Sequence, residues 1–397
     1  MIPTEKLYYT DPYLKNTTAT ILKKRKEKES WWYAFDRTIF YPGGGGQSPD
    51  EGFINSNELI DIKEEGGVIW HELSRELTGN VSMELKWSLR IRRMQQHTGQ
   101  HLISAVFYRE FGINTVSVHL GQTDTLIEFD TSDISAAILR EAEDRINAKI
   151  REHIAIRSHW VPKKKLSAYD LRRDIKVESD PVRLIHIDNY DVTGCGGTHV
   201  GSTSEIGLVK IIGTEKIRKR TRIQFRIGES AYQLFTQLVT VIQKLSNNLS
   251  SSYEDLEMKI SKLLDEQKDL RRILNVTRKN WLQLRIEQLN CQDRAGFFVM
   301  KDLSQTDLVD ISLYWLEKFQ KPCFFICEED NKYFFTIRSI LEKRSSALNF
   351  IKTVGARFGL KGGGSNEFVQ GIISQTVVQE DYLAALKEAF EENISRE

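Results

Sequence analysis

Two short clusters in the sequence place metal-binding side chains four residues apart. The first cluster, residues 97–101 (HTGQH), lies in a segment that predicts a helix, where positions i and i+4 share one face. The second cluster, residues 195–199 (CGGTH), brackets two glycines that permit a tight turn of the backbone. Three imidazoles and one thiolate are a ligand set that Zn²⁺ favours. We therefore predict a metalloenzyme whose metal ligands and catalytic residues are His97, His101, Cys195 and His199.

The two clusters differ in specificity. In a chain with eight histidines, an isolated HxxxH pair on a helix is more often two partly exposed polar residues. The CGGTH run is more specific because it contains the only cysteine before position 291. Four protein ligands complete a tetrahedral site, whereas hydrolytic zinc keeps one position open. Either one ligand, for which we select His199, leaves the metal, or the metal binds substrate by expanding its coordination.

The clusters resemble the HxxxH…CxxxH signature of the editing domain of alanyl-tRNA synthetase. Freestanding AlaX-type proteins share this signature, and threonyl-tRNA synthetase contains a related domain. Upstream, residues 36–47 (DRTIFYPGGGGQ) are similar to the family's D-x-T-x-F-Y-P-x-G-G-G-Q. Downstream, residues 204–211 (SEIGLVKI) are similar to the stretch that follows the family's CGGTH. The resemblance covers about residues 1–230, with the motifs in the family's order.

This resemblance implies a zinc-dependent hydrolase that removes serine or glycine in trans from tRNA for alanine. A pocket shaped for a small side chain rejects glycine and serine weakly, so a second site must remove the error. The zinc ion would polarise the ester carbonyl, lower the pKa of a bound water or orient the substrate amine. Among the residues of the motifs and the strand-like segment 115–119, we select as substrate-binding residues Gly44, Gly45, Gly46, Gln47, Thr98, Gln100 and Ser117.

Two other functions stay open. One is a non-catalytic RNA-binding protein in which the zinc ion is only structural. The other is an editor of a different aminoacyl-tRNA, such as the threonyl system, because HxxxH is shared with it. The residue 40–47 motif and a glycine-rich run near the C-terminus favour the alanine system.

The composition is typical of a cytoplasmic protein of two or three domains. The 397 residues include 40% hydrophobic and 28% charged residues, and the net charge is only +1, so RNA contacts must come from local patches. Four cysteines without a regular framework suit a reducing compartment. The N-terminus has no apolar signal core, and no apolar run approaches membrane-spanning length. We therefore expect a cytoplasmic location and no membrane partner.

We predict an α+β protein with four parts. Residues 1–90 alternate short apolar and polar segments, which predicts a small β-barrel with a loop at the glycines of 43–46. Residues 91–230 mix helices and strands, with one strand predicted at residues 182–187, and form the zinc-binding editing domain. Residues 231–290 form a helical linker or coiled coil, and residues 291–397 form a small α/β domain. In this last part, Cys323 and Cys327 are predicted to be buried structural thiols.

A 4-3 spacing of mostly apolar residues between Leu249 and Leu284 predicts a helix with a heptad seam. The seam must pack against either another chain, which would give a homodimer through the helical and C-terminal regions, or a returning helix at residues 231–245. Serine and asparagine residues at 246–252 offer a break, which favours the helical hairpin.

Two segments are predicted to contact RNA. Residues 216–222 (KIRKRTR) supply cations for phosphates. Residues 358–371 (FGLKGGGSNEFVQG) resemble the glycine-rich signature of the DHH-associated domain, although Ser365-Asn366 replaces the family's Arg-Pro. A glycine loop at residues 361–364 would offer backbone amides to phosphate. The selected RNA-binding residues are Lys216, Arg218, Lys219, Arg220, Lys361, Gly362, Gly363 and Gly364.

Overall fold

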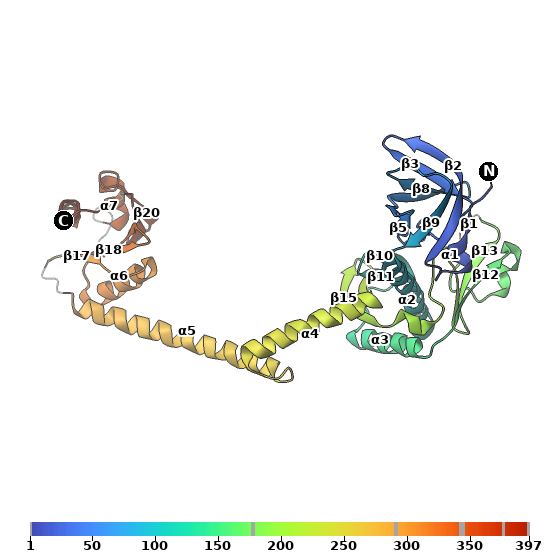
Figure 1. Ribbon diagram of the computed structural model, residues 1–397. Helices are drawn as coiled ribbons and strands as arrows, with labels where there is room; N and C mark the ends of the chain where they lie inside the picture. The colour runs from blue at the N-terminus through green and yellow to red at the C-terminus, as the bar shows by residue number, and fades with distance from the viewer. Residues whose placement is uncertain (1, 176–178, 290–292, 341–345, 375–377, 395–397) are drawn as a thin grey trace. The chain divides into compact units, whose positions relative to one another are not determined.

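The computed structural model describes residues 2–175, 179–289, 293–340, 346–374 and 378–394 (Figure 1). The chain divides into two compact units, Met1–Asn248 and Leu249–Glu397. Both units combine helices with sheets, which confirms the predicted mixture of α and β structure. The finer domain boundaries stay predictions, and the one at 290/291 lies outside the described residues. Among the described helices, none combines the length and apolar character needed to cross a membrane.

The first part of the chain forms a seven-stranded sheet with the order β6-β5-β9-β2-β3-β8-β7. Its strands are β2 (Asn16–Glu27), β3 (Ser30–Phe35), β5 (Gly52–Ile54), β6 (Asn57–Glu58), β7 (Asp61–Glu65), β8 (Val68–Leu73) and β9 (Asn80–Leu85). On β9, buried and exposed residues alternate, as expected for a sheet with one face on the core. Among the described residues no ladder joins the edge strands β6 and β7. The predicted β-barrel is therefore present as an open half-barrel.

A long central helix, α2 (Trp87–Phe111), organises the rest of the first unit. Twelve consecutive residues of α2, 96–107, are buried, so this stretch is enclosed on all sides and not only along one stripe. Its apolar side chains share a core with helix α3 (Ala136–Arg151) and a four-stranded sheet of order β10-β11-β16-β15. The strands are β10 (Thr115–Leu120), β11 (Thr125–Phe129), β15 (Val209–Ile217) and β16 (Arg220–Ile227).

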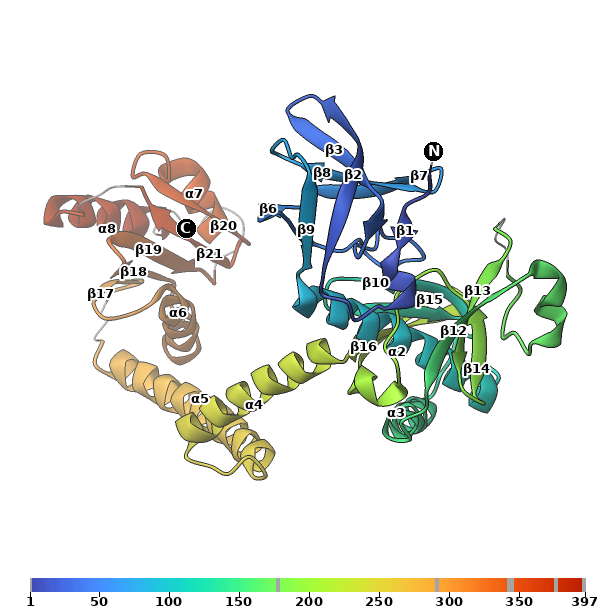
Figure 2. The same cartoon turned by 45° about the vertical axis from the view of Figure 1, so that its right-hand side comes forward.

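A separate antiparallel sheet, with the order β12-β13-β14, leads to the second cluster (Figure 2). Its strands are β12 (Ile156–Val161), β13 (Val182–Ile187) and β14 (Asp191–Gly194). The predicted strand at residues 182–187 is confirmed as β13. Because β14 ends at Gly194, the sheet fixes the point from which the CGGTH loop departs.

The second unit contains a five-stranded sheet of order β17-β18-β19-β21-β20. Its elements are α5 (Leu256–Glu287), β17 (Gly296–Met300), α6 (Gln305–Phe319), β18 (Cys323–Glu329), β19 (Lys332–Arg338), α7 (Ala347–Val354), β20 (Leu360–Gly364), β21 (Phe368–Ile373) and α8 (Glu380–Ile394). Cys323 and Cys327 are fully buried on β18, and burial raises the pKa of both thiols. The prediction of structural thiols is thus confirmed.

The helix predicted between Leu249 and Leu284 begins later in the structure than in the prediction. Helix α4 (Glu229–Leu249) ends at the first seam position, and α5 begins only at Leu256, so Tyr253 precedes the helix. The predicted break is therefore present, and it shortens the seam. Leu282 and Ile286 at the end of α5 pack into the core of the second unit, whereas Leu270 and Leu274 are exposed. The packing of these exposed residues against a returning helix or against another chain stays a prediction.

The predicted glycine loop at residues 361–364 is wrong, because these residues form the edge strand β20. A Cβ atom on Gly362 would lie 2.4 Å from the carbonyl oxygen of Gln370, and one on Gly364 would lie 2.0 Å from that of Phe368. The glycines thus allow close approach of the two strand backbones. Within the described residues, β20 is the edge strand of its sheet, so one row of its backbone groups pairs with no described strand.

Candidate metal centre

The four predicted ligands lie together in the first unit. One ligand atom from each of His97, His101, Cys195 and His199 lies within 4.8 Å of all the others. The Sγ atom of Cys195 is 3.3 Å from Nε2 of His97 and 3.3 Å from Nε2 of His199. The three imidazoles are buried, and the thiol is half-buried. This arrangement is a compact donor set around one point, as a tetrahedral metal site requires.

Helix α2 supplies the first pair of ligands. His97 and His101 are one turn apart, and their ring centroids are 5.0 Å apart. The CGGTH loop brings His199 to 4.5 Å from the ring of His97. The predicted helix is present and the CGGTH segment is a loop with a bend at Gly197, and each brings two of the predicted ligands to the same point.

Gln47 from the glycine-rich loop holds the ring of His97. The Oε1 atom of Gln47 accepts hydrogen bonds from the Thr198 backbone amide at 3.0 Å and from Nδ1 of His97 at 2.8 Å. The Nε2 atom of Gln47 donates to Thr198 Oγ1 at 2.7 Å. With its Nδ1 atom engaged by Gln47, His97 has its Nε2 atom directed at the cluster, where a metal would bind it. Gln47 therefore orients a predicted ligand, a role that the sequence analysis had not assigned to it.

Thr98 holds the ring of His199 in a similar way. Its Oγ1 atom is 3.1 Å from Nδ1 of His199 and accepts a hydrogen bond from the Val200 backbone amide at 3.2 Å. This contact leaves Nε2 of His199 directed at Cys195. Thr98 is fully buried, so the predicted contact with substrate is corrected to a contact with a cluster residue.

Two side chains that the sequence analysis missed fix the CGGTH loop. Buried Arg183 donates from Nη1 to the carbonyl oxygens of Cys195 at 3.1 Å and Gly197 at 2.7 Å. The hydroxyl of Tyr9, on the short helix α1 (Leu7–Thr10), donates to the carbonyl oxygen of Gly196 at 3.0 Å. Tyr9 lies 187 residues before its partner, so no local pattern could have indicated this contact.

The ionisation of the cluster suits a cation. Burial lowers the pKa of His199 to about 3 and also lowers the pKa of His101, so both rings are neutral. Burial opposes ionisation of Cys195, but the adjacent imidazoles of His97 and His199 bring the pKa of the thiol well below its usual range. The Nδ1 atom of His101 is buried and has no hydrogen-bond partner in the described part of the chain. Two neutral imidazoles beside a thiol that ionises readily suit Zn²⁺.

The cluster opens into a cavity of about 970 Å³. Of the predicted substrate-binding residues, Gly45, Gly46, Gln100 and Ser117 line this cavity together with His97, His101 and Cys195, whereas Gly44, Gln47 and Thr98 do not. All four glycines of residues 43–46 have positive φ values between 60° and 131°, which other residues rarely adopt, so the run forms the predicted loop. A buried ion pair between Asp50 and Arg90 joins the chain after this loop to α2.

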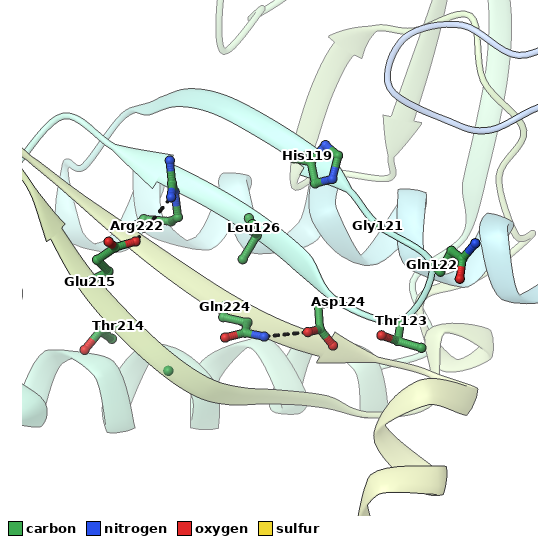
Figure 3. A pocket seen from close by; sticks show the side chains of 11 residues that line it. His119, Gly121, Gln122, Thr123, Asp124, Leu126, Thr214, Glu215, Arg222 and Gln224 are labelled. Carbon is green, nitrogen blue, oxygen red and sulfur yellow. Dashed lines mark hydrogen bonds and ion pairs between the residues drawn. The ribbon is translucent and has the colours of Figure 1, made fainter.

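A second pocket, of about 500 Å³, lies on the β10-β11-β16-β15 sheet (Figure 3). Its charged groups are paired with one another or with close neighbours: Asp124 contacts Gln224 and Arg226, and Arg222 contacts Glu128 and Glu215. The described residues hold no second cluster of metal-binding side chains, so this pocket offers no comparable chemistry.

The predicted RNA-binding residues fall into two groups. Lys216, Arg218, Lys219 and Arg220 lie at the exposed tip of the β15–β16 hairpin. Lys216 pairs with Asp133 at 3.1 Å and Arg220 pairs with Glu128 at 3.3 Å, which reduces the charge available to a phosphate. Lys361, Gly362, Gly363 and Gly364 lie on β20 in the second unit.

Known proteins match the region around the cluster. The family described as "Threonyl and Alanyl tRNA synthetase second additional domain" matches residues 182–223, which include the CGGTH loop. The alanyl-tRNA editing protein AlaX-L of Pyrococcus horikoshii is 28% identical over 391 residues, covering 92% of this chain and 94% of that protein. The predicted resemblance to long AlaX-type editing proteins is thereby confirmed.

Two further relatives agree with this AlaX-type resemblance. The alanyl-tRNA editing protein Aarsd1-B of Xenopus laevis is 30% identical over 268 residues, covering 66% of this chain and 65% of that protein. The alanine–tRNA ligase of Sulfurisphaera tokodaii is 30% identical over 300 residues, covering 71% of this chain. The match spans only 32% of that ligase, so this chain is similar to one part of a larger enzyme.

Proposed function

We propose that this chain is a zinc-dependent hydrolase that deacylates tRNA for alanine carrying serine or glycine. The main support for the proposal is the cluster of His97, His101, Cys195 and His199. Three of its residues, His97, His101 and Cys195, line a large cavity. The similarity to AlaX-L over 94% of that protein supports the choice of substrate. We expect such an editor to act in the cytoplasm, with tRNA as its partner.

The chain's own residues would hold and orient the reactants. A zinc ion bound by the four cluster residues would supply Lewis acidity toward the ester carbonyl or a bound water. Gln47 accepts a hydrogen bond from Nδ1 of His97 and Thr98 contacts Nδ1 of His199, so in both rings Nε2 is the atom left for the metal. Gln100 and Ser117 lie on the cavity wall and would contact the amino acid. The hydrogen bond between Thr98 and His199 argues against His199 as a ligand that leaves the metal.

The glycine-rich loop would form another wall of the substrate site. Gly45 and Gly46 line the cavity, and ideal Cβ atoms on them would meet no atom within 4 Å. Their bare backbone is therefore accessible to a substrate, while their positive φ values hold the turn. Gly44 instead accepts a hydrogen bond from the Tyr41 hydroxyl at 2.9 Å, which fixes the loop.

A deacylation assay tests this function. Purified protein is incubated with tRNA for alanine charged with serine, glycine or alanine, and the disappearance of each ester is followed. We expect seryl or glycyl ester to be cleaved much faster than alanyl ester, since an editor that acts equally on alanine would undo correct charging. Equal rates on serine and alanine would contradict editing, and no cleavage at all would favour a non-catalytic RNA-binding role.

One observation keeps a second substrate open. The family that matches residues 182–223 is described for both the threonyl and alanyl synthetases. Seryl-tRNA for threonine is therefore a necessary comparison in the same assay. Faster cleavage of that ester than of seryl-tRNA for alanine would move the proposed substrate to the threonyl system.

A further inference from the structure

An exposed indole lies at the wall of the cluster's cavity. Trp160 on β12 is 53% exposed and lines the cavity together with His97 and Cys195. Across the β12–β13 ladder, Trp160 is directly opposite Arg183. Directly opposed residues of an antiparallel pair project to the same face, so both side chains face the cavity.

Two contacts join this indole to the loop that carries the cluster. The ring of Tyr9 packs edge-on against Trp160 with a centroid distance of 5.6 Å, and its hydroxyl donates to the Gly196 carbonyl. The guanidinium of Arg183 lies 4.7 Å from the Tyr9 ring centroid and donates to two further loop carbonyls. The indole is thus supported by groups that also hold the metal-binding loop, while half of its surface stays open.

The surroundings of Trp160 suit a nucleotide. Exposed aromatic side chains bind nucleobases by stacking, and cationic side chains bind the adjoining phosphates. Arg173 lines the same cavity, is exposed, and forms no ion pair within the described residues. A planar base on the indole would therefore have a cation in the same cavity for its phosphate.

We propose that Trp160 stacks the terminal adenine of the tRNA and thereby positions the aminoacyl ester at the cluster. This inference rests on the proposed function, because the ester is attached to the ribose of that terminal nucleotide. Base and ester then enter the cavity as one unit. Trp160 is a positioning residue and exchanges no proton or electron pair with the substrate.

A binding cycle tests this stacking. The full chain is titrated against two fluorescent acceptor-stem hairpins, one ending in CCA and one lacking only the terminal adenine base. For the wild type, we expect removal of the base to weaken binding about tenfold or more. Trp160→Ala should weaken binding of the intact hairpin to a similar extent and abolish the difference between the hairpins. Trp160→Phe should retain most of the difference.

His159→Ala is the matched control, because His159 is adjacent on β12 and projects to the opposite face of the sheet. It should bind both hairpins like the wild type. If Trp160→Ala keeps the full sensitivity to the base, the stacking proposal is overturned.

Deacylation of seryl-tRNA by the wild type is measured in parallel and tests the proposed function separately. Cleavage without coupling between Trp160 and the base overturns only the stacking. Coupling without cleavage supports the stacking and overturns the hydrolase. If the wild type neither binds the hairpins nor cleaves seryl-tRNA, both proposals are overturned.

Discussion

At the scale of single residues, the cluster depends on side chains that are not metal ligands themselves. Gln47 and Thr98 each bond the Nδ1 atom of one imidazole and so direct its Nε2 atom toward Cys195. The sequence motifs were sufficient to select both residues, but as substrate contacts. Their actual partners lie 50 and 101 residues away, and only the folded chain brings them together.

Gln47→Ala is expected to weaken zinc binding about 10- to 100-fold, the usual effect of removing a group that orients a ligand. Gln47→Glu retains an acceptor for Nδ1 of His97 and should bind zinc more tightly than Gln47→Ala. Competition with a chelator of known affinity measures both. Gln122→Ala, at an exposed glutamine that does not line the cluster's cavity, is the control. If Gln47→Ala bound zinc with wild-type affinity, the hydrogen bond between Gln47 and His97 would not be needed for zinc binding.

His71, in the core of the half-barrel, is expected to make stability depend on pH. Burial lowers its pKa from 6.5 to about 4, and its ring lies between the Tyr33 carbonyl and the Thr38 hydroxyl. Between these pH values the unfolded chain binds one more proton than the folded chain. This group therefore lowers the free energy of unfolding by about 1.4 kcal/mol for each unit that the pH falls. Above pH 6.5 it contributes no slope.

Urea unfolding at pH 7, 6 and 5 measures this effect by comparing the wild type with His71→Gln. The wild type should lose stability more steeply as the pH falls, because the variant lacks the titrating group. The cluster histidines contribute equally to both proteins, so the difference isolates His71. Parallel slopes would contradict the assignment of a neutral buried imidazole.

At the scale of elements, the CGGTH loop requires its second glycine for space. A Cβ atom on Gly197 would lie 2.2 Å from Cε1 of His97, whereas one on Gly196 would meet only the Tyr9 hydroxyl at 3.7 Å. Gly197→Ala should therefore displace His97 and lower zinc content sharply, while Gly196→Ala should bind zinc like the wild type. Elemental analysis of the two purified variants measures the contrast. Equal zinc in both would show that the loop has room to move.

Elements with strong local patterns were predicted well from the sequence, and those that depend on a partner were not. The strand at residues 182–187 and the helix around His97 follow from the residue types within their own segments, without reference to a partner element. Strand β20 contains three consecutive glycines, which gave no side-chain pattern, and its strand character comes from pairing with β21. The sequence predicted a closed barrel, but a barrel closes only if its two edge strands meet, and no local pattern specifies where the edge strands β6 and β7 lie.

At the scale of the whole molecule, the division into two units separates the cluster from the C-terminal RNA-binding candidates. All four cluster residues and the cavity belong to Met1–Asn248, whereas Lys361 and β20 belong to Leu249–Glu397. The first unit also has its own apolar cores around the half-barrel and α2. We therefore expect chemistry in the first unit and additional RNA affinity from the second.

A fragment that ends at Asn248 should retain zinc and cleave seryl-tRNA at saturating substrate. It should bind tRNA more weakly than the full chain, and its salt dependence should be shallower by about one unit of slope for each phosphate that the second unit neutralises. Binding titrations at several salt concentrations measure this difference. An unchanged affinity and slope would exclude the second unit from RNA binding. Retained zinc without cleavage would contradict the division of roles.

The central claim is that the cluster binds one zinc ion on which ester cleavage depends. The most direct measurement combines elemental analysis with the rate of seryl-tRNA cleavage before chelation, after chelation and after zinc is restored. We predict about one zinc per chain, loss of activity with the metal, recovery on its return, and little zinc or activity in His97→Ala and Cys195→Ala. Full zinc content in both variants, or full activity in the zinc-free protein, would contradict the account.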